Sequence, residues 1–91
     1  MRKVIEGKLY DTEKANLIYE FQKYANIDST YGHTKTWVTA QLYQTNKGNW
    51  FELVEGKNTS DVLNKLNEDK VKEILAHDPE KYQEFFELED A

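Results

Sequence analysis

Near the middle of the chain stands Thr36-Trp37-Val38-Thr39-Ala40-Gln41-Leu42-Tyr43-Gln44-Thr45-Asn46-Lys47-Gly48-Asn49-Trp50-Phe51-Glu52-Leu53-Val54. Both arms are dense in β-branched and aromatic residues, which favour strands. Asn46-Lys47-Gly48 has the form of a three-residue turn, with glycine where a left-handed backbone is needed. We predict a β-hairpin, in which Tyr43 faces Phe51 and Gln44 faces Trp50 if Thr45 faces Asn49 across the turn. Both faces then carry aromatic side chains, so one face is expected to stay partly exposed.

The segment before this hairpin has the spacing of a helix. Its apolar residues follow the pattern i, i+1, i+4, i+7, i+8: Leu17, Ile18, Phe21, Tyr24 and Ala25. These positions share one helical face, so we predict a helix capped by Asp11 or Thr12 and ending at about Asn26. Residues 27–34 are rich in turn formers and are predicted to be a loop. Residues 4–10 are predicted to form a short strand or a tight hairpin that turns at Glu6-Gly7.

Beyond the hairpin, residues 55–60 are predicted to be a loop. Residues 62–66 fit a third strand of the sheet or the entry to a helix, and we favour the strand. Asn67 is expected to cap a helix from Glu68 to about His77. Asp78-Pro79 then starts a second helix at about 79–88, with Asp as the cap and Pro at the first position. Its aromatic residues have the spacing of a face that packs on the body: Tyr82, Phe85 and Phe86.

These elements predict one α+β domain over residues 1–91. The expected architecture is a small antiparallel sheet of three to four strands around the central hairpin, with one helix before the hairpin and one or two C-terminal helices. A chain of 91 residues leaves little room for a second domain.

The charge is uneven along the chain. Residues 78–91 contain six carboxylates and one basic residue, Lys81, so this segment carries the net charge of −5 that the whole protein has. Residues 1–77 are balanced. A neutral body with an acidic C-terminal element suggests a surface that meets something basic.

The candidate partner-binding residues are the carboxylates of this element: Glu80, Glu84, Glu87, Glu89 and Asp90. On a helix, Glu80, Glu84 and Glu87 fall at i, i+4 and i+7 and form a carboxylate stripe, with about 6 Å between neighbours. That spacing is close to the spacing of phosphates along one DNA strand, so a basic groove could accept the stripe. The alternative is a solvated helix face that keeps a small protein in solution.

No catalytic chemistry stands out. The chain has no cysteine, which excludes disulfides and thiolate metal sites. His33 and His77 lie far apart in sequence, and His77 suits the end of a helix, where a cation is favoured. Neither Ser29 nor Ser60 sits in a strand–turn–helix elbow, and the glycines do not cluster into a phosphate-binding loop. We expect no catalytic residue, no metal and no cofactor.

Four aromatic residues could form a stacking platform for nucleic-acid bases: Tyr31, Trp37, Tyr43 and Trp50. Nothing basic accompanies them, so we favour their packing in a core between the hairpin and the first helix. The acidic balance likewise argues against direct binding of nucleic acid, which needs clustered Lys and Arg.

The location is expected to be the cytoplasm. The start, Met1-Arg2-Lys3-Val4-Ile5-Glu6, has basic residues without the apolar run of a secretory signal. No stretch approaches the roughly 20 apolar residues of a membrane helix, so no membrane partner is expected. An exposed hairpin face could pair with a second copy in a homodimer.

Three blocks of the chain resemble a group of small proteins carried by phages, plasmids and integrative elements of Gram-positive bacteria. The blocks are Val4-Ile5-x-Gly7-Lys8-x-Tyr10-Asp11-Thr12-Glu13-x-Ala15, Leu42-Tyr43-x-Thr45-x-x-Gly48-x-Trp50-Phe51 and Asp78-Pro79-Glu80-Lys81-Tyr82. The resemblance implies that some members are anti-CRISPR proteins that inhibit type II (Cas9) effectors. This chain departs from the group after Phe51, where many relatives have Gly-Glu-Gly-Gly and it has Val54-Glu55-Gly56-Lys57.

We therefore expect a non-enzymatic inhibitor from a mobile genetic element, an anti-CRISPR protein that binds a basic surface of a Cas9-type effector. Two alternatives stay open. One is a host-directed regulatory module, antitoxin-like or binding a transcription factor, which would use the same acidic face. The other is a small metal-dependent nuclease, which would need paired carboxylates in a pocket.

Overall fold

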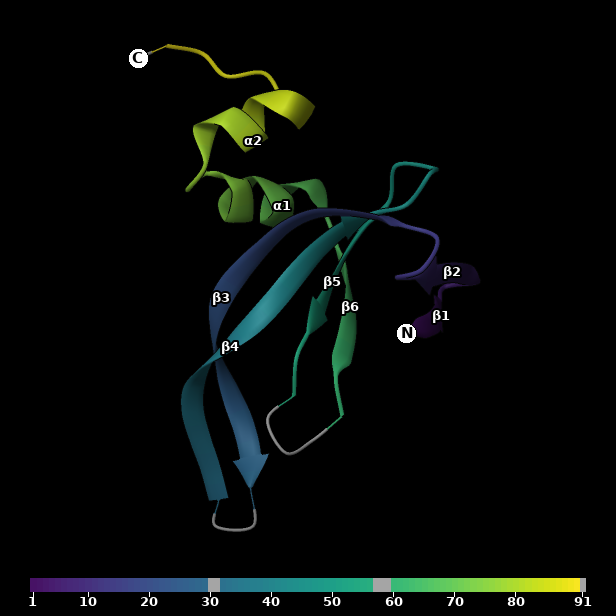
Figure 1. Ribbon diagram of the computed structural model, residues 1–91, viewed down its shortest axis with the longest axis vertical. Helices are drawn as coiled ribbons and strands as arrows, with labels where there is room; N and C mark the ends of the chain where they lie inside the picture. Colours follow the sequence, from purple (N-terminus) through teal and green to yellow (C-terminus); the bar gives the residue numbers. More distant parts are fainter. Residues whose placement is uncertain (30–31, 57–59, 91) are drawn as a thin grey trace.

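The computed structural model describes residues 1–29, 32–56 and 60–90, without the side chains of residues 25–29, 33 and 34. The chain forms two antiparallel sheets followed by two short helices (Figure 1). The first sheet pairs β1 (Arg2–Ile5) with β2 (Lys8–Asp11). The second has the order β3 (Asn16–Ser29), β4 (Gly32–Gln44), β5 (Trp50–Val54), β6 (Val62–Leu66). The helices are α1 (Glu68–Leu75) and α2 (Pro79–Phe85).

The central hairpin is formed by β4 and β5, in the predicted register. Tyr43 pairs with Phe51 and Gln44 with Trp50. The Thr45 amide donates a hydrogen bond to the Asn49 carbonyl oxygen at 2.8 Å, and Gly48 has a φ of 88°, in the left-handed region that favours glycine. The strongest hairpin pattern in the sequence is therefore confirmed.

Both faces of this hairpin are covered near its turn, whereas Trp37, farther along β4, is 59% exposed, so one face stays partly exposed as expected. Consecutive residues of a strand point to opposite faces, and Trp50 and Phe51 are both buried. On one face Phe51 stacks on Tyr43 with ring centroids 5.1 Å apart and meets Tyr10 of β2 edge-on at 5.6 Å. The N-terminal hairpin therefore closes this face.

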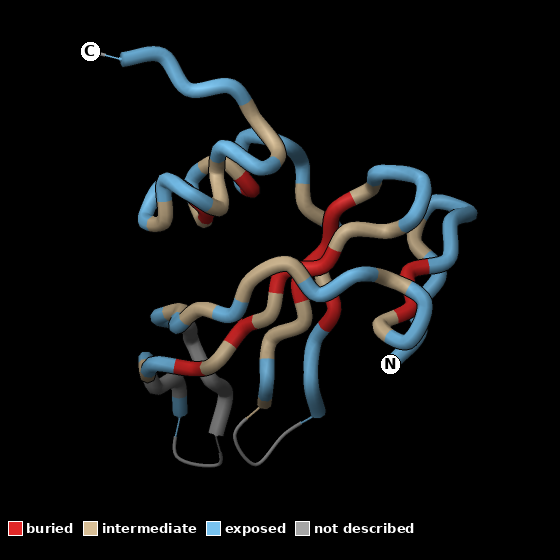
Figure 2. Tube along the Cα trace, turned by 45° about the horizontal axis from the view of Figure 1, so that its top comes forward, coloured by how far each residue is buried: buried red, intermediate tan, exposed pale blue. Residues whose placement is uncertain are grey.

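The opposite face is closed by the helices. Leu42 and Trp50 form a buried cluster with Val71 and Leu75 of α1, which we call the helix-side cluster. From the second helix, Phe85 meets the Trp50 ring edge-on at 5.3 Å, as the final residues of α2 fold over the sheet. Figure 2 shows buried residues in the sheet, in the helix nearest to it and in the N-terminal hairpin, whereas the C-terminal segment is exposed.

The predicted helix between Asp11 and Asn26 is wrong, and with it the α+β class that depended on that helix. The segment is β3, a 14-residue strand that pairs with β4 along almost its whole length. The predicted loop over residues 27–34 is also wrong: residues 27–29 end β3 and residues 32–34 begin β4, while 30 and 31 lie outside the described residues. The protein is mostly β-sheet, with helices only at its C-terminal end in the described chain.

A β-bulge explains why the sequence pattern of this strand is misleading. The register shifts between Leu17 and Tyr19, so the apolar residues do not alternate as in a regular strand. Ile18, Tyr19 and Phe21 all pack against the helix-side cluster. Two residues of the predicted helical face, Leu17 and Tyr24, are instead more than half exposed. β4 needs a partner for its backbone groups along its length, and β3 supplies it.

The N-terminal segment, predicted as a short strand or a tight hairpin, forms the hairpin and turns at Glu6-Gly7. Both residues have positive φ, 53° and 77°, as in a two-residue type I′ turn. The N-terminal hairpin contacts β6 through polar groups as well as through apolar side chains. Lys65 Nζ lies 2.7 Å from Glu6 Oε2, and Lys3 Nζ donates to the Leu63 carbonyl oxygen at 3.2 Å. Asp11, a proposed helix cap, is instead buried in β2 beside Arg2.

The C-terminal elements follow the prediction closely. Residues 62–66 form β6, the favoured strand. Asn67 caps α1 by accepting from the Lys70 amide at 2.9 Å, and Asp78 caps α2 by accepting from the Lys81 amide at 3.2 Å. Within the described chain, neither helix is long and apolar enough to cross a membrane.

Replacing Phe51 should test the contact between the sheet and the N-terminal hairpin. Phe51 is completely buried, so we expect Phe51→Ala to lower the free energy of unfolding by about 3–5 kcal/mol. Urea denaturation measures the change. Val4→Ala is the control because Val4 is 68% exposed and should change stability by less than about 0.5 kcal/mol. An equal, small effect of both variants would contradict the described core.

Alkaline pH should destabilise the protein through Tyr43. Burial, and secondarily the charge of Glu20, raise the pKa of Tyr43 above its ordinary value of 10.0. The neutral side chain is therefore favoured in the fold; its contribution is complete below the unfolded pKa and is lost as pH rises through the higher folded pKa.

The measurement is the free energy of unfolding of the protein and of Tyr43→Phe, each as a function of pH. The advantage of the wild type over the variant should shrink above about pH 10. Tyr24→Phe, at an exposed position, should follow the wild type. A difference between the wild type and Tyr43→Phe that does not change with pH would contradict the role given to burial.

Candidate functional site

The acidic C-terminal segment, residues 80–90, is only partly helical. The helix α2 ends at Phe85, and Phe86 is extended, with φ −138° and ψ 154°. Glu80 and Glu84 therefore lie on the helix, whereas Glu87, Glu89 and Asp90 follow it. The predicted helical stripe that included Glu87 is wrong.

The helix ends there against the sheet. Phe85 and Phe86 are consecutive, yet both rings contact Trp50, at centroid distances of 5.3 and 6.1 Å. Lys72 Nζ also lies over the Phe86 ring at 5.2 Å, which adds a cation–π contact. Tyr82, Phe85 and Phe86 all pack against the helix-side cluster, so the predicted inward face of this helix is confirmed.

The five candidate carboxylates are all exposed. Lys81 Nζ lies 3.4 Å from Glu84 Oε2, a pair at the surface that stabilises the fold little. Within the described residues no other cation pairs with Glu80, Glu87, Glu89 or Asp90. In the described part of the chain, Glu80, Glu87, Glu89 and Asp90 thus have no ion-pair partner, and a binding partner could reach them.

The aromatic residues of the suggested stacking platform do not lie together. Tyr43 and Trp50 are buried on opposite faces of the sheet, so their interpretation as core residues is confirmed, although the helix they were expected to pack on does not exist. Trp37 is 59% exposed, and its ring centroid lies 5.3 Å from that of Tyr24, its partner on β3. Tyr31 lies outside the described residues.

The histidines are not brought together into a described site. The side chain of His33 is outside the described part, and His77 is an exposed residue just after α1. In residues 1–29, 32–56 and 60–90, no group of three or more His, Asp or Glu side chains is placed to hold a metal ion.

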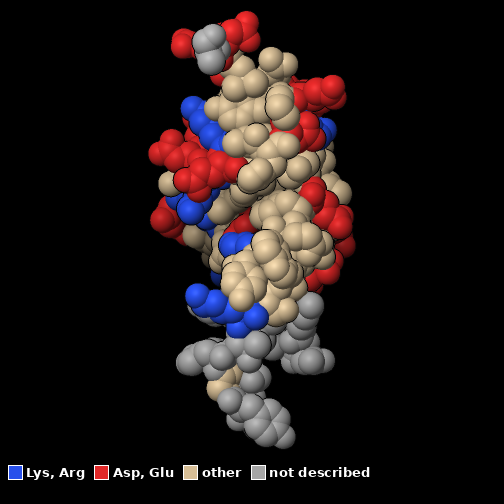
Figure 3. Space-filling model, turned by 90° about the vertical axis from the view of Figure 1, so that its left-hand side faces the viewer, with Lys and Arg blue, Asp and Glu red and all other residues tan. Residues whose placement is uncertain are grey.

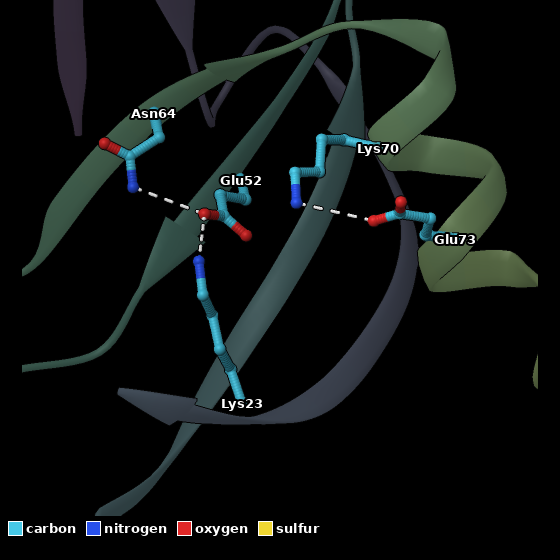
Figure 4. A network of polar contacts seen from close by, with 5 residues as sticks. All are labelled: Lys23, Glu52, Asn64, Lys70 and Glu73. Atoms are coloured by element: carbon cyan, nitrogen blue, oxygen red, sulfur yellow. Dashed lines mark hydrogen bonds and ion pairs between the residues drawn. The ribbon is translucent and has the colours of Figure 1, made fainter. Parts of the chain in front are cut away.

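A buried carboxylate is the main polar feature that the sequence analysis missed. Glu52 on β5 is 3% exposed. Its Oε1 accepts from Lys23 Nζ of β3 at 2.7 Å and from Asn64 Nδ2 of β6 at 3.3 Å (Figure 4). The alternation Trp50–Glu52–Val54 places Glu52 on the helix-side face, and this inward position in the strand was the available indication.

A groove separates β3 from α1, and we call it the β3–α1 groove. Its larger cavity, about 600 Å³, is lined by a run of β3 and by α1 with the residue that follows it: Tyr19, Glu20, Phe21, Gln22, Glu73, Ile74 and His77. A smaller cavity of about 250 Å³ shares four of these residues and reaches Lys23, Glu52 and Lys70. Figure 4 shows Lys70 and Glu73 on the helix wall, across from Lys23 and Glu52.

Another cavity, about 760 Å³, lies between the turn of the N-terminal hairpin and the β4–β5 turn. It is lined by Lys8, Lys14 and Lys47 and by no acidic residue. In Figure 3, acidic side chains lie at the C-terminal end and along both flanks, and a group of basic side chains lies toward the opposite end. Other basic side chains lie among the acidic ones on this face.

Comparisons with protein-family models, with curated proteins and with solved structures found no match to this chain. The resemblance to small proteins of mobile elements therefore stays a prediction.

Removing Lys23 should destabilise the protein, because among the described residues it leaves the Glu52 carboxylate with Asn64 as its remaining partner. We expect Lys23→Ala to lower the free energy of unfolding by about 1–3 kcal/mol. The control is Lys81→Ala, which removes the surface pair with Glu84 and should cost less than about 0.5 kcal/mol.

A double-mutant cycle with Glu52→Gln measures the coupling of the pair. Lys23→Ala should cost less in that background, because the neutral amide is easier to bury without a cation. Equal costs in both backgrounds would show that the Lys23 ammonium does not stabilise the Glu52 carboxylate.

Proposed function

We propose that the protein is a non-enzymatic binding protein whose acidic segment docks on a basic surface of another protein. The observation that carries this proposal is the exposure of Glu80, Glu84, Glu87, Glu89 and Asp90, with Lys81 as the one basic residue among them. Like charges so close together repel one another, and a basic partner would relieve that repulsion.

The position of the segment suits docking. Tyr82, Phe85 and Phe86 hold α2 on the sheet, and the residues after Phe86 continue away from the body (Figure 1). A partner could therefore contact these carboxylates without disturbing the core. Charge complementarity of this kind speeds association and weakens as salt rises.

The proposed partner is a Cas9-type CRISPR effector, and the protein an inhibitor from a mobile element that acts in the bacterial cytoplasm. The resemblance of the three sequence blocks supports this choice. Such effectors hold nucleic acid in positively charged channels and read their adjacent motif with arginines. Several charge-assisted hydrogen bonds from an acidic segment could occupy either place.

Cleavage of target DNA by Cas9-type effectors in vitro tests the partner. The protein is added before or after guide loading, at low and at high salt. We expect inhibition that weakens at high salt, and the order of addition shows whether guide loading or DNA binding is blocked. No inhibition by a large excess, across several effectors, would overturn the choice of partner and lead to a search for a host protein that binds the segment.

Charge reversal tests the segment itself. Glu84→Lys with Glu87→Lys should weaken binding of the partner by at least about tenfold, because two attractive contacts become repulsive. Both residues are exposed, so the urea midpoint should stay close to that of the wild type.

The matched control is Glu13→Lys with Glu55→Lys. It changes the net charge equally, at exposed positions outside the segment, and should keep most of the affinity. Full inhibition by the folded Glu84→Lys, Glu87→Lys variant would rule out this surface.

A further inference from the structure

In the part of the chain that the structure describes, no strand lies beside the outer edge of β3. β3 is the first strand of the order β3-β4-β5-β6 and pairs with β4. Within the described residues, no hydrogen bond from another element's backbone reaches this edge. An open edge presents a row of N–H and C=O groups that can pair with a further strand.

The larger cavity of the β3–α1 groove runs along this edge. On the β3 side it is lined by four consecutive residues, Tyr19 to Gln22. Side chains of a strand alternate between its two faces, so a cavity lined by four consecutive residues fits a position along the strand's edge. The other wall is Glu73 and Ile74 of α1 and the following His77. The cavity therefore places an open backbone edge opposite a helix.

We propose that the β3–α1 groove binds an extended, basic segment of a partner protein, which adds to the four-stranded sheet beside β3. Strand addition at a sheet edge is an established way of binding peptides, in which the backbone supplies affinity and alternate side chains supply specificity. This proposal does not rest on the acidic segment.

The charges around the edge favour a basic occupant. The larger cavity is lined by Glu20 and Glu73 and by no Lys or Arg. The smaller cavity adds Lys23, Glu52 and Lys70, and Lys23 is already paired with Glu52. Glu20 lies on the Tyr43 side of the sheet, where its charge helps to raise the pKa of the Tyr43 hydroxyl. Glu73 lies on the helix side. Each face of an added strand would thus meet one carboxylate. Lys70, 3.4 Å from Glu73, forms only an exposed surface pair, which is weak.

The groove also has an apolar floor. Tyr19, Phe21 and Ile74 are half-buried and pack against the helix-side cluster. Apolar side chains of an added strand could cover their remaining surface. A second copy of this chain suits the edge less well, because pairing two β3 edges would bring Glu20 and Glu73 of both copies together, and like charges across an interface are unfavourable.

The probe is a blocked peptide of alternating lysine and valine, titrated into the full chain and followed by fluorescence anisotropy. Two control peptides separate the contributions. One replaces lysine by glutamate, and the other keeps the side chains but carries N-methyl groups on alternate backbone amides. We expect both controls to bind at least about tenfold more weakly, since one loses the charge complementarity and the other the strand hydrogen bonds.

Two double variants locate the peptide. Glu20→Lys with Glu73→Lys reverses the charge of two side chains in the groove. Glu84→Lys with Glu87→Lys makes the same change of charge on the acidic segment. We expect the first to weaken binding by at least about tenfold and the second by no more than about threefold in physiological salt. Amide hydrogen exchange should slow in Tyr19–Gln22 when the unmodified peptide is bound.

Four results would overturn the proposal. The first is the absence of binding by the lysine–valine peptide. The second is equal binding of the N-methylated peptide, which would mean attraction by charge without strand addition. The third is loss of binding only in the Glu84→Lys, Glu87→Lys variant, which would place the peptide on the acidic segment. The fourth is a dimer of the peptide-free protein with slowed exchange at Tyr19–Gln22, which would make a second copy the occupant.

Discussion

Two consecutive aromatic residues on β5 hold the structure together, because strand geometry sends them in opposite directions. Phe51 stacks on Tyr43 and meets Tyr10, which closes one face of the sheet with the N-terminal hairpin. Trp50 packs with α1 and the two C-terminal phenylalanines on the other face. In a chain of 91 residues, a sheet with one bare face would bury too little surface. Through Trp50 and Phe51, both ends of the chain thus pack against the middle of the sheet.

Where local chemistry was decisive, the sequence predicted the structure. Gly48 in the turn sets the β4–β5 register, and the capping side chains Asn67 and Asp78 start the two helices at the expected residues. β3 was not predicted as a strand, because its strand conformation depends on pairing with β4 and not on its own sequence pattern. A bulge after Leu17 disrupts the alternation, and the backbone groups of β4 then impose a strand on residues whose apolar spacing resembles a helix.

The candidate sites also differ in how far the sequence predicts them. Exposed carboxylates in a run such as residues 80–90 are visible in any sequence, although the end of α2 at Phe85 depends on the contact of Phe86 with Trp50. The β3–α1 groove could not be predicted, because it joins Tyr19–Gln22 to Glu73 and Ile74 across the fold. It also requires β3 to be an edge strand, which the expected helix excluded. The Lys23–Glu52 pair depends on the same strand.

The order of the strands bears on how the protein folds. In the main sheet each strand pairs with its neighbour in sequence, so the sheet can grow by successive hairpins with little loss of chain entropy at each step. The N-terminal hairpin is different, because Lys3 meets the Leu63 carbonyl across 60 positions of sequence. Among the polar contacts of the described residues, this one spans the greatest separation in sequence. We therefore expect the meander to form quickly, and the covering of its Phe51 face to follow as a later, slower event.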